Sequence, residues 1–158
     1  MGCAACMNAC PLKCIILKRD NEGFEYPCIN EKLCSGCGKC IDACPIRNVV
    51  NRSNEFGDII AVYAAKNVDN GIRRQSSSGG IFYLLAKEII RRGGIVVGAA
   101  FNSEQQVEHI IIDTVDEISR IMGSKYVQSA SKWTLASVNN YLKQGPGGTL
   151  RRSCFFGR

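Results

Sequence analysis

The chain has 158 residues, a net charge of +6 and 46% hydrophobic residues, which is enough for one or two small globular domains. Three of the basic residues, Arg151, Arg152 and Arg158, lie close to the C-terminus, and the charge of the remainder is too small to indicate nucleic-acid binding. No apolar run reaches the roughly 18 residues of a membrane span, and no signal peptide opens the sequence. We therefore expect a soluble, cytoplasmic protein.

Nine of the ten cysteines precede residue 45, and seven of them fall into two spaced runs. The second run is C-x2-C-x2-C-x3-C-P, the spacing by which bacterial ferredoxins hold iron–sulfur clusters, and the first repeats its last three members. This pattern predicts a two-cluster ferredoxin-type module over residues 1–54. The cysteines of the two runs are Cys3, Cys6 and Cys10, then Cys34, Cys37, Cys40 and Cys44.

In such a module each cluster takes three cysteines from one run and a remote fourth from the other. One ligand set is complete, with Cys34, Cys37, Cys40 and the remote Cys10. The other set has Cys3, Cys6 and Cys44, and its first ligand would fall just ahead of Met1. Three outcomes stay open for that cluster: three irons, four irons with an outside ligand, or recruitment of Cys14.

Two further cysteines in this half, Cys14 and Cys28, are either extra ligands or small core hydrophobes. Disulfides would need an oxidising compartment. Structural zinc sites place more residues between their cysteine pairs, and the single histidine, His109, is remote. The interpretation is therefore iron–sulfur. Between the two runs, I-I-L-K-R followed by a turn at residues 21–23 predicts a β-hairpin.

The second half predicts a mixed α/β domain over residues 58–145, so that the whole chain is of the α+β class. Residues 58–66 are rich in β-formers and predict a buried strand. Helical spacing begins after Gly79 and stops at Gly93 and Gly94. The sequence then predicts strands at residues 95–101 and 106–113. A short helix with the capping box T-V-D-E is expected at 114–122, and a last helix at 131–143.

A serine–glycine cluster, S-S-S-G-G at residues 76–80, precedes the first of these helices. Such a helix start favours an anion such as a nucleotide phosphate, but the serines are equally explained as ordinary caps and the glycines as a tight turn. The side chains of Arg73, Arg74 and Lys125 either neutralise a pyrophosphate or are solvated. We expect a structural role for His109 and packing of the last helix by Trp133.

The order of the motifs resembles the beta-subunit family of coenzyme F-420 (8-hydroxy-5-deazaflavin) hydrogenases and dehydrogenases, from about Gly2 to Gly145. The resemblance rests on the two ferredoxin runs, V-Y-A-A-K-N, S-S-S-G-G-I-F, G-G-I-V-V-G-A-A-F and G-S-K-Y-V-Q-S. It implies two iron–sulfur clusters, FAD, a redox partner subunit or ferredoxin-type electron donor, and a deazaflavin acceptor. It also implies that the flavin lies by Ser77, Ser78, Gly79 and Gly80, with Lys125 and Tyr126 near it.

The chain departs from the family pattern at both ends, because one cluster ligand is missing and the tail at residues 146–158 replaces an apolar strand and a G-T-P-C motif. A truncation or frameshift explains both, and predicts an exposed strand edge and an incidental Cys154. Two functions stay open. One is an oxidoreductase subunit whose clusters pass electrons to FAD and a deazaflavin-type acceptor. The other is a ferredoxin-like carrier with an interaction domain and no hydride-transfer activity of its own.

Overall fold

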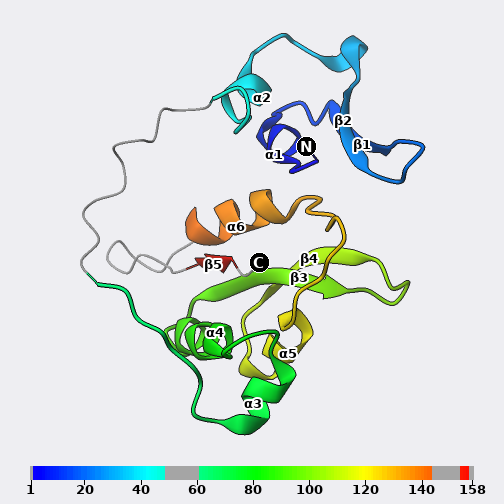
Figure 1. The fold of residues 1–158 in the computed structure, drawn as a ribbon. Helices are drawn as coiled ribbons and strands as arrows, with labels where there is room; N and C mark the ends of the chain where they lie inside the picture. The colour runs from blue at the N-terminus through cyan, green and yellow to red at the C-terminus, as the bar shows by residue number, and fades with distance from the viewer. Residues whose placement is uncertain (1, 49–60, 144–153, 157–158) are drawn as a thin grey trace. The chain divides into compact units, whose positions relative to one another are not determined.

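The computed structural model describes residues 2–48, 61–143 and 154–156 and divides the chain into two compact units (Figure 1). These units are Met1–Ala64 and Ala65–Arg158. Each combines short helices with a small sheet, which confirms the predicted α+β class. No helix in the described part of the chain has the length and apolar character needed to cross a bilayer.

The first unit is built on a β-hairpin, as the sequence predicts. Its strands pair antiparallel from Ile15 opposite Ile29 to Arg19 opposite Glu25. The Asp20 side chain accepts hydrogen bonds from the backbone N–H groups of Glu22 and Phe24, which closes the turn between the strands. The elements of this unit are α1 (Ala5–Ala9), β1 (Ile15–Arg19), β2 (Glu25–Ile29), the 3₁₀ helix η1 (Glu31–Leu33) and α2 (Lys39–Asp42).

The apolar core of the first unit is very small. Its buried residues are Ala4, Met7, Cys14 and Ile15, whereas Leu33 is more than half exposed. Units of this size rarely bury enough apolar surface to fold alone, and natural examples use metals or disulfides as additional cross-links. The composition of this core therefore agrees with a fold that depends on an inorganic group.

The second unit has a three-stranded sheet in the order β4-β3-β5. Strand β3 pairs antiparallel with β4 from Val96 to Phe101 and parallel with β5 at Ile95, Val96 and Val97. The strands are β3 (Ile95–Phe101), β4 (Val107–Ile112) and β5 (Cys154–Phe156). The helices are α3 (Asn70–Gln75), α4 (Ile81–Arg91), the 3₁₀ helix η3 (Val115–Glu117), α5 (Ile118–Ile121) and α6 (Thr134–Lys143).

Helices cover both faces of this sheet, with α4 and α5 on one side and α6 on the other (Figure 1). Side chains alternate between the faces of a strand. Accordingly, Val96 packs in a core with Ala86 of α4 and Ile118 of α5, whereas Val97 packs in a second core with Val138 of α6. This three-layer arrangement holds the N-terminus of α4 and the C-terminus of α5 against one face of the sheet.

Two sequence predictions about residues 58–145 are wrong. The strand predicted at 58–66 is absent from residues 61–66, where Val62 and Tyr63 are each 85% exposed, while residues 58–60 lie outside the described part. A high β-propensity reflects fit to a half-buried sheet, and residues 61–66 pair with no strand in the described part of the chain. The last helix begins at Thr134 rather than Ser131, because Lys132 has a φ of 39°, which is incompatible with a helix.

The prediction that the sheet has an exposed strand edge is also wrong for part of β3. Within residues 146–158, expected to be an aberrant tail, the segment Cys154–Phe156 forms β5 and occupies the edge of β3 at Ile95–Val97. The short helix α3 was not predicted at all, although Asp69 caps it by accepting hydrogen bonds from the N–H groups of Gly71 and Ile72.

Gly98 of β3 allows α5 to pack directly on the strand. A Cβ atom added there would lie 2.8 Å from Cβ of Ile121. Gly98→Ala is therefore expected to lower the free energy of unfolding of this unit by about 1–3 kcal/mol through overpacking. Urea titration followed by the fluorescence of Trp133, the single tryptophan, measures this effect. A midpoint equal to that of the wild type would contradict the close packing.

Candidate metal centre and serine–glycine pocket

A cavity of about 370 Å³ in the first unit brings together cysteines from both sequence runs. Cys10 follows α1, Cys34 follows η1, Cys37 lies in the next loop and Cys40 belongs to α2. These four residues are the complete ligand set expected from the sequence, and all of them line the cavity. Cys10 thus shares one cavity with three cysteines that lie at least 24 positions further along the chain.

The loop around this cavity depends on two glycines with left-handed backbone conformation. Gly36 has a φ of 70° and Gly38 a φ of 76°, which residues with a Cβ adopt only at a cost. The N–H of Gly36 donates to Sγ of Cys34 at 3.5 Å. Backbone N–H groups directed at ligand sulfurs are what tunes the potential of an iron–sulfur cluster.

The donor set and the shape of the cavity fit an iron–sulfur cluster. In the described part of the chain, no three His, Cys, Asp or Glu side chains converge closely enough to hold a single metal ion. A four-iron cluster does not require such convergence, because each thiolate binds a different iron and the ligands stand around a space. Apolar side chains complete the lining, including Leu12, Ile15, Ile29 and Ile41.

The surroundings shift the thiol pKa of three of the seven cysteines, and the direction differs from one cysteine to another. Hydrogen bonds from the backbone and then the side chain of Cys14 lower the pKa of Cys10, which favours the thiolate that binds iron. The backbone N–H groups of Arg47 and Ile46 lower the pKa of Cys44 in the same way. Burial raises the pKa of Cys6. The incomplete set of Cys3, Cys6 and Cys44 does not line this cavity.

Cys14 lies at the cavity of the complete set. Its sulfur is 3.3 Å from Sγ of Cys10, and its side chain is 4% exposed within the small core. The shared hydrogen bond with Cys10 raises the pKa of Cys14 to about 11. This environment supports a small core hydrophobe that contacts the cluster cavity. Cys28 lies on β2 and does not line the cavity.

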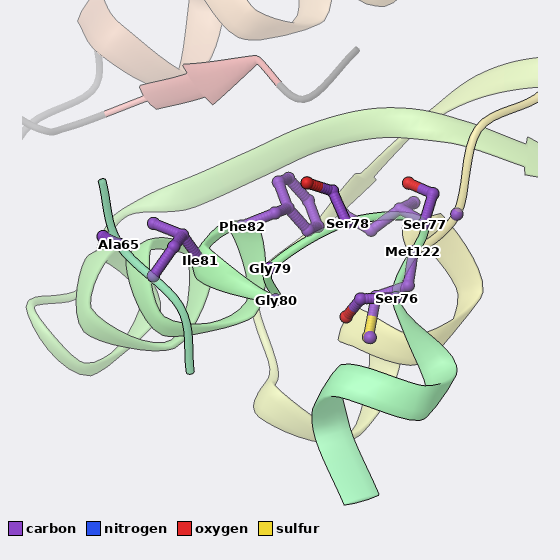
Figure 2. Close-up of a pocket in the computed structure, with 11 residues that line it drawn as sticks. Ala65, Ser76, Ser77, Ser78, Gly79, Gly80, Ile81, Phe82 and Met122 are labelled. Carbon is purple, nitrogen blue, oxygen red and sulfur yellow. The ribbon is translucent and has the colours of Figure 1, made fainter. Parts of the chain in front are cut away.

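A second pocket, of about 300 Å³, lies in the second unit at the N-terminus of α4. The predicted residues Ser77, Ser78, Gly79 and Gly80 all line it. Figure 2 shows Ser76, Ser77 and Met122 on one side of the two glycines and Ala65 and Ile81 on the other. The remaining lining residues are Phe82, Ile121 and Gly123, so that one wall of the pocket is apolar.

The two glycines of the pocket are packed tightly against the segment 65–67. A Cβ atom added to Gly79 would lie 2.9 Å from the carbonyl oxygen of Ala65. Gly80 has a φ of 74°, and a Cβ atom added there would lie 3.1 Å from Cβ of Asn67. Both positions therefore require glycine, one because of space and the other because of space and backbone conformation.

The serines do not cap α4, so their interpretation as ordinary caps of this helix is wrong. The N-cap of α4 is Gly80, and no side chain caps it. Ser76 instead donates to the carbonyl oxygen of Ile72 at 2.7 Å, at the end of α3. The hydroxyl groups of Ser77 and Ser124 are 3.3 Å apart. The first N–H groups of α4 lack helical acceptors, as at any helix start.

Two of the three cations considered for this pocket, Arg73 and Lys125, make contacts within the protein, whereas Arg74 is exposed. Arg73 donates to the carbonyl oxygen of Asn67 at 3.0 Å. Lys125 donates to the carbonyl oxygens of Met122 at 2.6 Å and Gly123 at 3.2 Å, and burial lowers its pKa. Tyr126 is 93% exposed. Among the described lining residues there is no charged side chain, and neither Lys125 nor Tyr126 is one of them.

Two family models match this chain in the regions of the two sites. One, described as a 4Fe-4S dicluster domain, matches residues 1–48. The other, described as the N-terminal part of the coenzyme F420 hydrogenase/dehydrogenase beta subunit, matches residues 62–136. The chain is a fusion of these two domains. No curated protein matches it.

The dicluster domain contains all nine N-terminal cysteines, and the beta-subunit domain contains the whole serine–glycine pocket. The suspected family and the fusion are thereby confirmed. Together the two domains support an iron–sulfur electron-transfer oxidoreductase subunit.

Sequence reasoning missed several residues of the beta-subunit pocket. Ile121, Met122 and Gly123 come from the end of α5, about forty residues after the serines, and only the packing of α5 on β3 brings them there. Asn67 also received no role from the sequence, where it is only the last residue of V-Y-A-A-K-N, although it is 2% exposed. The pattern N-x-D directly before a short helix was the available signal for it.

His109 of the beta-subunit domain has a structural environment. Its Nδ1 lies 2.9 Å from Oγ of Ser129, and the ring does not line the pocket. Trp133 precedes α6 and is 42% exposed, while Val138 is the buried residue of that helix.

Burial lowers the pKa of His109 below the ordinary 6.5. Because the unfolded chain binds this proton at higher pH than the folded one, the stability contributed by the neutral ring is present above about pH 6.5 and is lost as the pH falls through the folded pKa. The chain has one histidine, so its ring C2 proton gives a unique NMR signal. We expect a titration midpoint below 6.5. A midpoint at or above that value would contradict the buried environment.

Proposed function

We propose that this chain is an iron–sulfur flavoprotein subunit that relays electrons through two clusters to FAD and a deazaflavin-type acceptor. The observation that carries the proposal is the meeting of Cys10 with Cys34, Cys37 and Cys40 around one cavity, in a chain that also contains the serine–glycine pocket. Two sequence-distant cysteine runs meet in this way when a cluster is shared between them. The electrons would come from a redox partner subunit or a ferredoxin-type donor.

Seven cysteines would hold the two clusters, within a domain over residues 1–54. Cys10, Cys34, Cys37 and Cys40 would bind a four-iron cluster. Cys3, Cys6 and Cys44 would bind the other, which holds three irons or four irons with an outside ligand, because only three thiolates belong to that set. The low pKa of Cys44 supports its role as a ligand.

The flavin would bind in the domain over residues 58–145, at Ser77, Ser78, Gly79 and Gly80. When bound, FAD exchanges single electrons with clusters and hydride with an organic acceptor. Hydroxyl groups and the first N–H groups of α4 would donate to the nucleotide, while Ile81, Phe82 and Met122 would keep water from the ring. Lys125 and Tyr126 would lie near the flavin without lining the pocket.

Anaerobic purification and reconstitution of the full chain tests this proposal. We expect about seven to eight irons per chain, a similar amount of acid-labile sulfide, and a flavin that is released on denaturation. Reduction should bleach both the cluster and the flavin absorption. A preparation without iron and sulfide would refute the cluster assignment.

One observation favours a second candidate, a ferredoxin-like carrier with an interaction domain and no hydride transfer. The serine–glycine pocket has no charged lining residue in the described chain, and Arg73 and Lys125 are engaged with backbone carbonyls. Arg73 and Lys125 would then have to give up these bonds to pair with a pyrophosphate. Iron with reversible one-electron reduction and no flavin in the same preparation would select this candidate.

A further inference from the structure

Asn67 has an unusual position for a polar residue. It is 2% exposed, and no other polar or charged residue in the described part of the chain is classed as buried. Burial of an amide side chain is costly unless hydrogen bonds replace those to water. The contacts of Asn67 therefore identify what the buried amide accomplishes.

Asn67 bonds to both glycines of the serine–glycine pocket. Its backbone N–H donates to the carbonyl oxygen of Gly79 at 2.7 Å. Its side-chain Nδ2 donates to the carbonyl oxygen of Gly80 at 3.4 Å. The remaining side-chain atom, Oδ1, accepts from the N–H of Asp69 at 3.0 Å, and Asp69 is the N-cap of α3. One residue thus connects the starts of α3 and α4.

These hydrogen bonds fix the direction of the N–H groups that follow the two glycine carbonyls. In a trans peptide the carbonyl oxygen and the following N–H point in opposite directions. Because Asn67 holds the oxygens of Gly79 and Gly80, the N–H groups of Gly80 and Ile81 point away from Asn67. Gly80 and Ile81 line the pocket, and their N–H groups belong to the N-cap and the first residue of α4, where no helical acceptor exists.

We propose that Asn67 is a positioning residue, which fixes the Gly79–Gly80 and Gly80–Ile81 peptide planes so that two N–H groups face an oxygen of the bound flavin nucleotide. The inference rests on the proposed flavin site. Because no cation lines the pocket, the oriented N–H groups would be the hydrogen-bond donors to an anionic or carbonyl oxygen of the nucleotide. Asn67 acts through the backbone and does not line the pocket itself.

Two variants of Asn67 and one control test the inference in the full, anaerobically reconstituted chain. Asn67→Ala removes both side-chain bonds. Asn67→Asp keeps the acceptor for Asp69 but loses the donor to Gly80. Asn102→Ala is the matched control, because the Asn102 side chain likewise makes two hydrogen bonds to the backbone, in this case accepting both, from Glu104 and Gln106, in a turn outside the pocket. Trp133 fluorescence verifies that each variant is folded.

We expect the dissociation constant for FAD to rise about tenfold or more in Asn67→Ala and to stay at the wild-type value in Asn102→Ala.

In Asn67→Asp, affinity for FAD should be low at pH 8 and recover towards pH 6, because the protonated carboxyl group can again donate to Gly80 and burial raises the pKa of a carboxyl group. The wild type should change little over this range. A merely structural role would not produce this pH dependence. Equal FAD affinity in all four proteins would overturn the inference and leave the proposed function standing.

A separate measurement distinguishes failure of the inference from failure of the proposed function. Amide hydrogen exchange at Gly80 and Ile81 needs no flavin. We expect faster exchange in Asn67→Ala than in Asn102→Ala, because the peptide planes are no longer held. If the wild type binds no FAD, the flavin proposal fails, and faster exchange would still support the positioning role. Unchanged exchange at these two amides would overturn it.

Discussion

Cys34→Ala should remove about four irons per chain, whereas Cys28→Ala should remove none. Cys34 lines the 370 Å³ cavity with Cys10, Cys37 and Cys40, and its sulfur accepts a hydrogen bond from Gly36. Cys28 is a partly buried cysteine of the same unit that does not line the cavity. Comparing the two variants therefore separates loss of a ligand from loss of any cysteine.

The same substitution should also lower the stability of the first unit. Among its described residues the buried core consists of Ala4, Met7, Cys14 and Ile15, and metal binding in such a unit contributes directly to its folding. Iron and sulfide analysis measures the loss of irons, and limited proteolysis of residues 1–48 measures the loss of stability. Cys14→Ala should keep the iron count and lower stability only modestly, because a small buried side chain is shortened. Wild-type iron in Cys34→Ala would contradict the ligand assignment.

The first unit was largely predictable because its chemistry is local in sequence. The spacing of the cysteines identifies the run, and the hairpin between the runs follows from the segment I-I-L-K-R and the turn at residues 21–23. The placement of Cys14 was not predictable. Its spacing allowed a ligand or a hydrophobe, and only the fold shows its sulfur 3.3 Å from that of Cys10.

In the second unit the strands β3 and β4 and the helix α4 followed from periodicity, with the bounds of β3 as expected. The predictions failed where contacts with distant segments determine the local structure. Residues 61–66 have strand-like composition, but Ala65 and Asn67 lie against Gly79 and Gly80 instead of joining the sheet. The apolar wall from α5 and the buried Asn67 both depend on contacts between segments far apart in sequence, which a single sequence does not encode as a pattern.

The largest effect expected in the second unit comes from Gly80→Ala compared with Gly93→Ala. Gly80 and Gly93 have nearly equal φ angles, 74° and 75°, so an alanine at either position costs about 1–2 kcal/mol for the left-handed conformation. A Cβ atom at Gly93 would meet nothing within 4 Å, whereas at Gly80 it would lie 3.1 Å from Cβ of Asn67 and 3.4 Å from Oγ of Ser76. Gly93→Ala therefore measures the backbone cost alone.

We expect Gly80→Ala to lower the free energy of unfolding by about 1–3 kcal/mol more than Gly93→Ala, because the added methyl group overpacks the contact with Asn67. FAD binding should be lost only in Gly80→Ala, since the methyl group displaces the segment that orients the start of α4. Urea titration followed by Trp133 fluorescence gives the stabilities, and flavin release gives the occupancy. Equal stabilities in the two variants would show that the segment 65–67 yields without cost, and the start of α4 would then lack the rigid support on which both the flavin pocket and the role of Asn67 depend.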